Sequence, residues 1–196
     1  MKYIVGIDEV GRGPLAGPVA VGAVCLSDGK INLRKLFPDA RDSKKLSPKK
    51  REEIFKKIKQ AEKKHILRYI VRYEDAQTID KLGINKAIRN CIDGCLERLR
   101  VNPKITSVFL DGGLRAPKKF VFQKTIIRGD DKKIIISLAS IVAKVSRDSS
   151  MCRLAKKYPK YGLEIHKGYG TARHRSAIKR HGLSIIHRKT FFEKLV

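Results

Sequence analysis

The chain has 196 residues, of which 45 are Lys or Arg and 19 are Asp or Glu, so its formal net charge is +26, and 42% of its residues are hydrophobic. The hydrophobic fraction is too high for a disordered polycation, and the length predicts one domain that buries roughly 70% of the surface of the unfolded chain. No apolar run approaches the ~20 residues of a transmembrane helix, and Asp8 and Glu9 interrupt the N-terminal apolar stretch where the core of a signal peptide would continue. We therefore expect a cytoplasmic protein with no membrane partner.

The positive charge indicates a polyanionic partner. Self-repulsion among the excess cations is relieved when a polyanion binds, so nucleic acid is the expected ligand, and an anionic membrane surface is the weaker alternative. The four cysteines, at positions 25, 91, 95 and 152, lack the CxxC spacing of zinc sites. We expect them to be reduced thiols.

The first half of the chain predicts two strands, a helix, a strand and a second helix. Residues 3–7 and 18–26 are apolar and rich in β-forming residues, and a loop with glycines joins them. A helix begins with Ser47 and Pro48 and carries apolar residues at helical spacing as far as Ala61. Residues 65–73 then predict a third strand, and 84–99 place their apolar side chains on one helical stripe.

The second half continues the same alternation. Residues 106–110 and 120–127 predict two further strands, and 134–154 predict a long helix whose small residues allow close packing on a sheet. We expect a loop over 158–171 and an amphipathic helix over 172–180. Strands that alternate with helices predict an α/β layered domain with a mixed sheet.

Four acidic residues stand at the predicted strand ends. Asp8 and Glu9 follow the first strand, Asp111 ends a central strand, and Asp130 ends another. Neighbouring strands can bring these carboxylates to one edge of the sheet. Hydrolysis of a phosphodiester at neutral pH is favoured by two divalent cations about 4 Å apart, and Mg²⁺ and Mn²⁺ prefer carboxylate oxygens. The pattern therefore indicates a metal-dependent nuclease.

Other acidic residues have simpler explanations. Asp131 can cap the helix that follows it, and Asp148 can pair with Arg147 or Lys144. We rank these two residues and Asp42 below Asp130.

The loop Gly11-Arg12-Gly13 places an arginine between two residues that permit close approach of the backbone. This arrangement suits a phosphate or a sugar hydroxyl, and the alternative is an ordinary tight turn.

Six sequence blocks resemble ribonuclease HII in the order of that family. They are GIDEVGRGPLAGPV at 6–19, DSKKLS at 42–47, LDG at 110–112, RGD at 128–130, SLASIVAKVSRD at 137–148 and HKGYGT at 166–171. The resemblance implies an RNase H-like fold, with a central mixed five-stranded sheet flanked by helices and a small C-terminal helical extension. Residues 1–160 would form the catalytic domain, and 161–196 a substrate-binding loop and helical extension packed on the same domain.

The resemblance also implies the activity. The expected enzyme hydrolyses the RNA strand of RNA–DNA hybrids and cuts duplex DNA on the 5′ side of embedded ribonucleotides. It would use two ions, Mg²⁺ or Mn²⁺, and leave 3′-hydroxyl and 5′-phosphate ends. We expect a monomer.

The family's site residues transfer onto matching positions of this chain. The four metal-binding and catalytic acids fall on Asp8, Glu9, Asp111 and Asp130, with Asp131 left as an alternative for the fourth. The loop that reads the 2′-hydroxyl falls on Gly11, Arg12 and Gly13, and the stacking tyrosine on Tyr169.

We expect three basic residues, Lys44, Lys45 and Lys167, to meet phosphates of the substrate. Four histidines are left open between substrate contact and helix capping: His166, His174, His181 and His187. Two other functions remain possible, an RNA-binding protein of ribosomal type and a junction resolvase with a similar fold.

Overall fold

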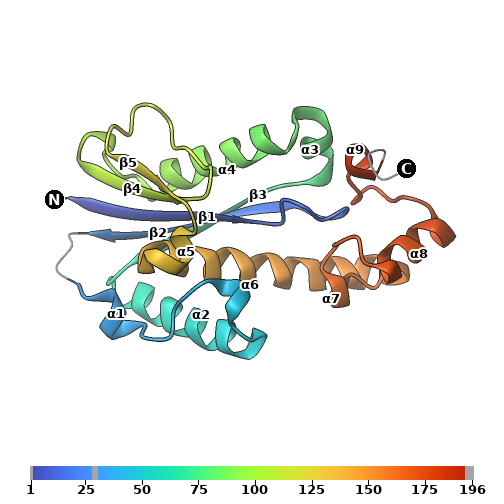
Figure 1. The fold of residues 1–196 in the computed structure, drawn as a ribbon, viewed down its shortest axis with the longest axis horizontal. Coiled ribbons are helices and arrows are strands. Elements are labelled where there is room, and N and C mark those ends of the chain that lie inside the picture. Colours follow the sequence, from blue (N-terminus) through green and yellow to red (C-terminus); the bar gives the residue numbers. More distant parts are fainter. Residues whose placement is uncertain (1, 28–30, 193–196) are drawn as a thin grey trace.

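The computed structural model describes residues 2–27 and 31–192, and its central element is a five-stranded sheet (Figure 1). The strand order is β3-β2-β1-β4-β5. The strands are β1 (Tyr3–Val10), β2 (Val19–Ser27), β3 (Arg68–Glu74), β4 (Thr106–Asp111) and β5 (Gln123–Ile126). β2 pairs antiparallel with β1 and β3, whereas β1–β4 and β4–β5 are parallel. The predicted mixed five-stranded sheet is confirmed.

Helices cover both faces of this sheet. α3 and α4 lie on one face, and α6 lies on the other with α2 packed against it (Figure 1). The helices are α1 (Leu33–Leu36), α2 (Pro48–Lys63), α3 (Ala76–Leu82), α4 (Ile84–Leu99), α5 (Gly129–Lys132), α6 (Ile134–Lys157), α7 (Leu163–His166), α8 (Ala172–His181) and α9 (Lys189–Phe192). In the described residues, no helix is long and apolar enough to cross a membrane.

Two of the predicted helices form for the expected reasons. Ser47 caps α2 by accepting a hydrogen bond from the Lys50 amide at 3.2 Å, and Pro48 occupies the first turn. The apolar stripe of α4 is buried against β2 and β3, and the helix ends at Arg100, whose backbone is left-handed.

α6 packs directly on the backbone of the sheet at two glycines. A Cβ atom on Gly22 would lie 2.5 Å from the carbonyl oxygen of Ala139, and one on Gly6 would overlap the carbonyl of Ile135. The absence of side chains at these positions of β1 and β2 lets the helix approach closely. The residues Ile135 to Ala143 are consequently all buried.

Several element boundaries differ from those predicted. β1 continues through Asp8 and Glu9 to Val10, because these residues pair with β2. β5 covers only four residues, since Phe120 turns into the core instead of joining the strand. α3 was not expected from the sequence, and Asp75 caps it. The expected loop over 158–171 contains a 3-10 turn and α7.

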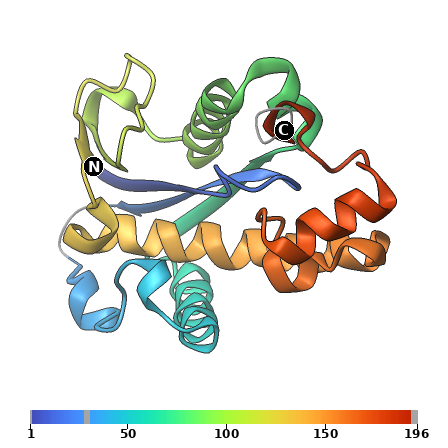
Figure 2. The ribbon, with the colours of Figure 1, turned by 45° about the vertical axis from the view of Figure 1, so that its right-hand side comes forward.

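The C-terminal segment folds back onto the loop between β1 and β2. α7 and α8 lie beside the end of α6, and the chain then returns to α9 near α3 (Figure 2). Ala16 forms a β-bridge with His187, and Asp80 of α3 accepts hydrogen bonds from the amides of Lys189 and Thr190. Residues far apart in sequence therefore frame one end of the sheet.

The packing of α6 on Gly22 generates a stability prediction. Gly22→Ala should lower the free energy of unfolding by about 2 kcal/mol, because the new methyl group meets a helix backbone that cannot move aside. Gly113→Ala is the matched control, since a Cβ at Gly113 meets no atom within 4 Å in the described structure. Urea denaturation measures both variants, and equal stabilities would contradict the packing argument.

Candidate active site

Three carboxylates from three elements meet at one edge of the sheet. Asp8 of β1, Asp111 of β4 and Asp130 of α5 each offer an oxygen atom, and these atoms lie within 4.8 Å of one another. The parallel register explains the first two, because Ile7 pairs with Leu110 and the acidic residues come next on each strand. We call Asp8, Asp111 and Asp130 the acidic cluster.

α5 brings the third carboxylate into the acidic cluster. The Gly129 amide donates to the Asp111 carboxylate at 2.6 Å, and the Ser137 hydroxyl of α6 donates to the Asp130 carbonyl, also at 2.6 Å. The prediction that Asp130 ends a strand is therefore wrong, since it lies on a short helix held against α6.

Glu9 lies beside the cluster and outside the group of three. Its carboxylate is 3.6 Å from the guanidinium of Arg12, which also donates to the side-chain oxygen of Asn85. Burial raises the pKa of Glu9, and the positive charge of Arg12 opposes this rise.

Burial and mutual repulsion act on the carboxylates of the acidic cluster. Burial raises the pKa of Asp8 well above its usual range, and the neighbouring carboxylate of Glu9 adds to the rise. Burial and then the charge of Asp111 raise the pKa of Asp130 to about 6. A bound cation would remove both the desolvation cost and the repulsion, and carboxylate oxygens are the ligands that Mg²⁺ and Mn²⁺ prefer. The donor set therefore fits such ions.

Asp131 is engaged elsewhere. Its carboxylate is 2.5 Å from the ammonium of Lys45 and 4.0 Å from the guanidinium of Arg128. The prediction that Asp131 caps α6 is wrong, because that helix starts after Lys133 without a side-chain cap. The geometry favours Asp130 over Asp131 as the fourth acidic residue.

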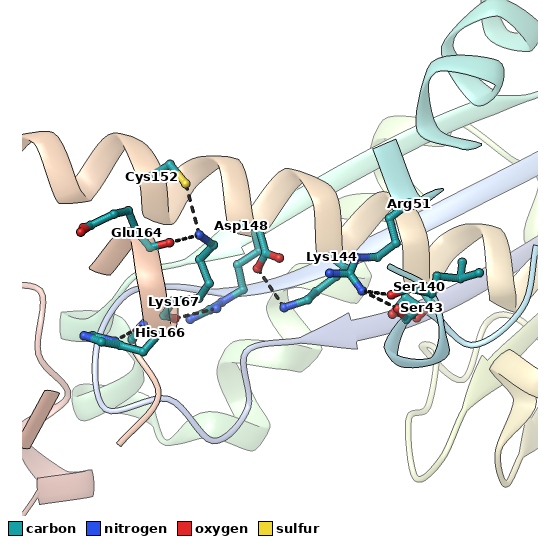
Figure 3. A network of polar contacts seen from close by, with 12 residues as sticks. Ser43, Arg51, Ser140, Lys144, Asp148, Cys152, Glu164, His166 and Lys167 are labelled. Atoms are coloured by element: carbon teal, nitrogen blue, oxygen red, sulfur yellow. Dashed lines mark hydrogen bonds and ion pairs between the residues drawn. The ribbon is translucent and has the colours of Figure 1, made fainter. Parts of the chain in front are cut away.

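Polar contacts continue along α6 away from the acidic cluster (Figure 3). Ser140 donates to the hydroxyl of Ser43 at 2.8 Å, and Lys144 pairs with Asp148 at 2.9 Å. The prediction that Asp148 forms an intrahelical ion pair is confirmed for Lys144.

The two glycines of the glycine-arginine-glycine loop have different surroundings: Gly11 is tightly packed, and Gly13 borders open space. Gly11 has φ of +87°, and a Cβ there would overlap the guanidinium of Arg147, so only glycine fits. A Cβ at Gly13 would meet no atom within 4 Å, which leaves open space beside this residue. The Arg12 side chain is half-exposed on the same loop. A ligand can therefore approach the backbone at Gly13.

The three predicted phosphate-binding lysines have different surroundings. Lys44 lies near the acidic cluster, where burial lowers its pKa but nearby carboxylates, led by Asp42, outweigh burial and raise it. Lys45 is paired with Asp131. The ammonium of Lys167 contacts the Glu164 carbonyl and lies 3.4 Å from the Cys152 sulfur (Figure 3).

Tyr169 is partly exposed and rests on buried histidines. Its carbonyl is 3.0 Å from Nδ1 of His174, whose ring stacks on His166 and whose Nε2 is 3.2 Å from Nε2 of His187. Burial and then the charge of His166 lower the pKa of His174 to about 4. These three histidines are buried under the Tyr169 loop, whereas His181 is exposed and packs edge-on against Tyr161.

The raised pKa of Asp130 predicts a pH-dependent stability difference. In the unfolded chain this carboxyl ionises near pH 4, whereas in the folded protein it ionises near pH 6. Its ionisation therefore opposes folding fully above pH 6 and not at all below pH 4. In EDTA, Asp130→Asn should be the more stable protein at pH 7, by roughly 1 kcal/mol after allowance for solvent screening. Thermal melts at pH 4 and pH 7 test this, and an advantage that is unchanged at pH 4 would contradict it.

Known proteins are similar to this chain in sequence and in fold. The family model for ribonuclease HII matches residues 5–194. A ribonuclease HII from Caldicellulosiruptor bescii is 40% identical over 195 residues, which cover 100% of this chain and 89% of that protein. The crystal structure of ribonuclease H2 from Pyrococcus horikoshii OT3 is 28% identical, with a TM-score of 0.77 over 98% of this chain and 96% of that one.

A more distant structure shows the same fold. Bst-RNase HIII, solved in complex with Mn²⁺, is 16% identical, with a TM-score of 0.68 over 92% of this chain and 63% of that one. The family match decides against a ribosomal-type RNA-binding protein and a junction resolvase. The chain belongs to the ribonuclease HII family, and it is a ribonuclease H, a hydrolase that acts on RNA–DNA hybrids.

Proposed function

We propose that this ribonuclease H cuts duplex DNA on the 5′ side of embedded ribonucleotides, as well as the RNA strand of hybrids, and leaves 3′-hydroxyl and 5′-phosphate ends. The observation that carries the proposal is the position of Asp8, one member of the acidic cluster, on β1, the strand that leads directly into the Gly11-Arg12-Gly13 loop. The acidic cluster, which we propose hydrolyses the phosphodiester, thus adjoins a loop suited to recognising a ribose.

The acidic cluster is the proposed site for two divalent ions. Asp8, Asp111 and Asp130 would hold them, with Glu9 completing the set from the edge of the group. Mg²⁺ or Mn²⁺ bound there supplies charge neutralisation at the scissile phosphate and lowers the pKa of water, the nucleophile. Bst-RNase HIII, a structure with the same fold, was solved in complex with Mn²⁺, which supports a divalent ion as the cofactor.

Burial of the carboxylates and a nearby lysine suit the site to bind metal ions and a phosphate. Burial of Asp8 and Asp130 excludes water and leaves their carboxylates repelling each other, so they favour a cation when ionised. Lys44, which lies near these carboxylates, is a proposed contact to a phosphate oxygen of the substrate.

The glycine-arginine-glycine loop is the proposed reader of the 2′-hydroxyl. This hydroxyl both donates and accepts hydrogen bonds and distinguishes RNA from DNA at a single nucleotide. Within the described part of the chain, the amides of Arg12 and Gly13 have no hydrogen-bond partner, and the space beside Gly13 is open. These amides and the Arg12 guanidinium can donate to the hydroxyl.

Tyr169 is the proposed stacking residue for the sugar on the 3′ side of the junction. It belongs to the segment 161–196, which we propose as the substrate-binding extension of the catalytic domain 1–160. Lys45 and Lys167 are proposed phosphate contacts that would exchange their present partners for substrate. The monomeric state and the cytoplasmic location stay predictions.

A nuclease assay tests the role of the acidic cluster. The substrate is duplex DNA with one ribonucleotide, incubated with Mg²⁺ or Mn²⁺. Asp8→Asn should lower the cleavage rate by at least 1,000-fold, and EDTA should abolish cleavage by the parent, because the site then lacks a metal-binding carboxylate or the metal itself. Asp148→Asn, which alters an ion pair on α6, is the control and should cut normally. Full activity of Asp8→Asn would contradict the assignment.

A binding assay tests the role of Arg12. Arg12→Ala should bind a ribonucleotide-containing duplex roughly tenfold more weakly, because it loses a charged donor to the sugar or phosphate. Its affinity for an all-DNA duplex of the same sequence should change less. Fluorescence anisotropy in EDTA measures both affinities without cleavage, and equal losses on both duplexes would show that Arg12 contributes only general charge.

A further inference from the structure

Two arginines are completely buried without a carboxylate partner. Arg147 of α6 and Arg188, which precedes α9, each have 0% of their surface exposed. No ion pair involves either of them within residues 2–27 and 31–192. Burying an unpaired charge costs several kcal/mol unless its hydrogen bonds are satisfied, so their partners are informative.

The partners of Arg188 are carbonyl groups of the loop between β1 and β2. Its Nη2 donates to the Gly11 carbonyl at 2.7 Å and to the Gly17 carbonyl at 2.9 Å, and its Nη1 donates to the Arg12 carbonyl at 3.0 Å. Its Nε also donates to Gly17, at 3.1 Å. One planar guanidinium therefore holds three carbonyls, an arrangement that a lysine ammonium cannot reproduce.

Arg147 holds the other end of the same loop. It donates to the carbonyl of Pro18 at 2.8 Å and, at 3.4 Å, to that of Ala16. Its Nη1 donates to the Lys167 carbonyl at 3.1 Å, two residues before Tyr169. The two guanidiniums thus join the loop at Gly11 to Gly13 and the segment carrying Tyr169 into one rigid unit.

The hydrogen bonds from Arg188 also act on the amides of Arg12 and Gly13. The Gly11 carbonyl and the Arg12 amide belong to one peptide group, and the Arg12 carbonyl and the Gly13 amide belong to the next. A hydrogen bond from a cation polarises each peptide group and strengthens its N–H as a donor. Arg188 therefore fixes the direction of both amides and increases their donor strength.

We infer that Arg188 is a positioning residue for ribose recognition, which it achieves by holding and polarising the two peptide groups of Gly11-Arg12-Gly13. The inference rests on the proposed function, in which this loop reads the 2′-hydroxyl. Arg188 does not touch the substrate, because the loop covers it completely.

The test measures discrimination between ribose and deoxyribose. Two duplexes of one sequence, with and without a single ribonucleotide, are titrated in EDTA against the parent, Arg188→Lys and Arg188→Ala, with fluorescence anisotropy as the readout. Both variants should lose at least tenfold in the ratio of the two affinities while keeping most of their affinity for all-DNA duplex. Guanidinium chloride at millimolar concentration should restore part of the ratio for Arg188→Ala and none for Arg188→Lys, because the free cation can occupy only the vacated space.

A control separates this role from a general effect of losing an arginine that donates to a backbone carbonyl. Arg68 also donates to a backbone carbonyl, that of Leu99 at 2.8 Å, but it lies on β3 outside the loop. Arg68→Lys should keep the parental ratio.

The outcomes distinguish the inference from the proposed function. If the parent does not prefer the ribonucleotide-containing duplex, the proposed function fails. If the parent discriminates and Arg188→Lys keeps that ratio, only the role of Arg188 fails. Loss of folding in both Arg188 variants, seen as absence of a cooperative thermal transition, would also overturn the inference, because the residue would then serve folding alone.

Discussion

The close contact between α6 and the glycines of β1 and β2 is the constraint on which the rest of the structure depends. Gly6 and Gly22 allow the helix backbone to lie against the sheet. This position brings Ser137 to the carbonyl of Asp130 and Arg147 to the loop after β1. One helix therefore places both the third carboxylate of the acidic cluster and one arginine that binds the loop between β1 and β2.

The protein buries two groups of charged side chains, the acidic cluster and the two arginines Arg147 and Arg188. The desolvation cost of each group is offset in a different way. The acidic cluster contains carboxylates whose burial and mutual repulsion raise the pKa of Asp8 and Asp130. Its energetic deficit is relieved when a cation binds. Arg147 and Arg188 instead satisfy their donors with backbone carbonyls. The first group favours binding of metal, and the second fixes carbonyl groups of the loop between β1 and β2.

The C-terminal segment contributes to the site through Arg188, one of the two buried arginines. Arg188 and the β-bridge between Ala16 and His187 tie it to the loop after β1, while three buried histidines pack against the segment that carries Tyr169. A loop built from glycines would otherwise sample many conformations, at an entropic cost to recognition. Contacts from the far end of the chain reduce that freedom before substrate arrives.

The amino-acid sequence by itself determined the elements with strong periodicity, the mixed α/β class, and the family through its six blocks. The helix at 84–99 was predicted to the residue, because its stripe of apolar side chains is a local property. Local signals also identified the acidic residues and the glycine-arginine-glycine loop as candidates. Arg147 lay within a recognised block, but nothing near it in sequence indicated its partners.

Only the tertiary structure decided which of these residues act together. β1 runs on through Asp8 and Glu9 because β2 pairs with them, and Asp130 joins the cluster on a helix of four residues that has no periodicity to detect. Asp131 is turned aside by Lys45, 86 positions away, and Arg188 reaches Gly11 across 177 positions. Such contacts depend on the tertiary fold, which brings distant residues together, and a local sequence pattern does not specify these long-range pairs.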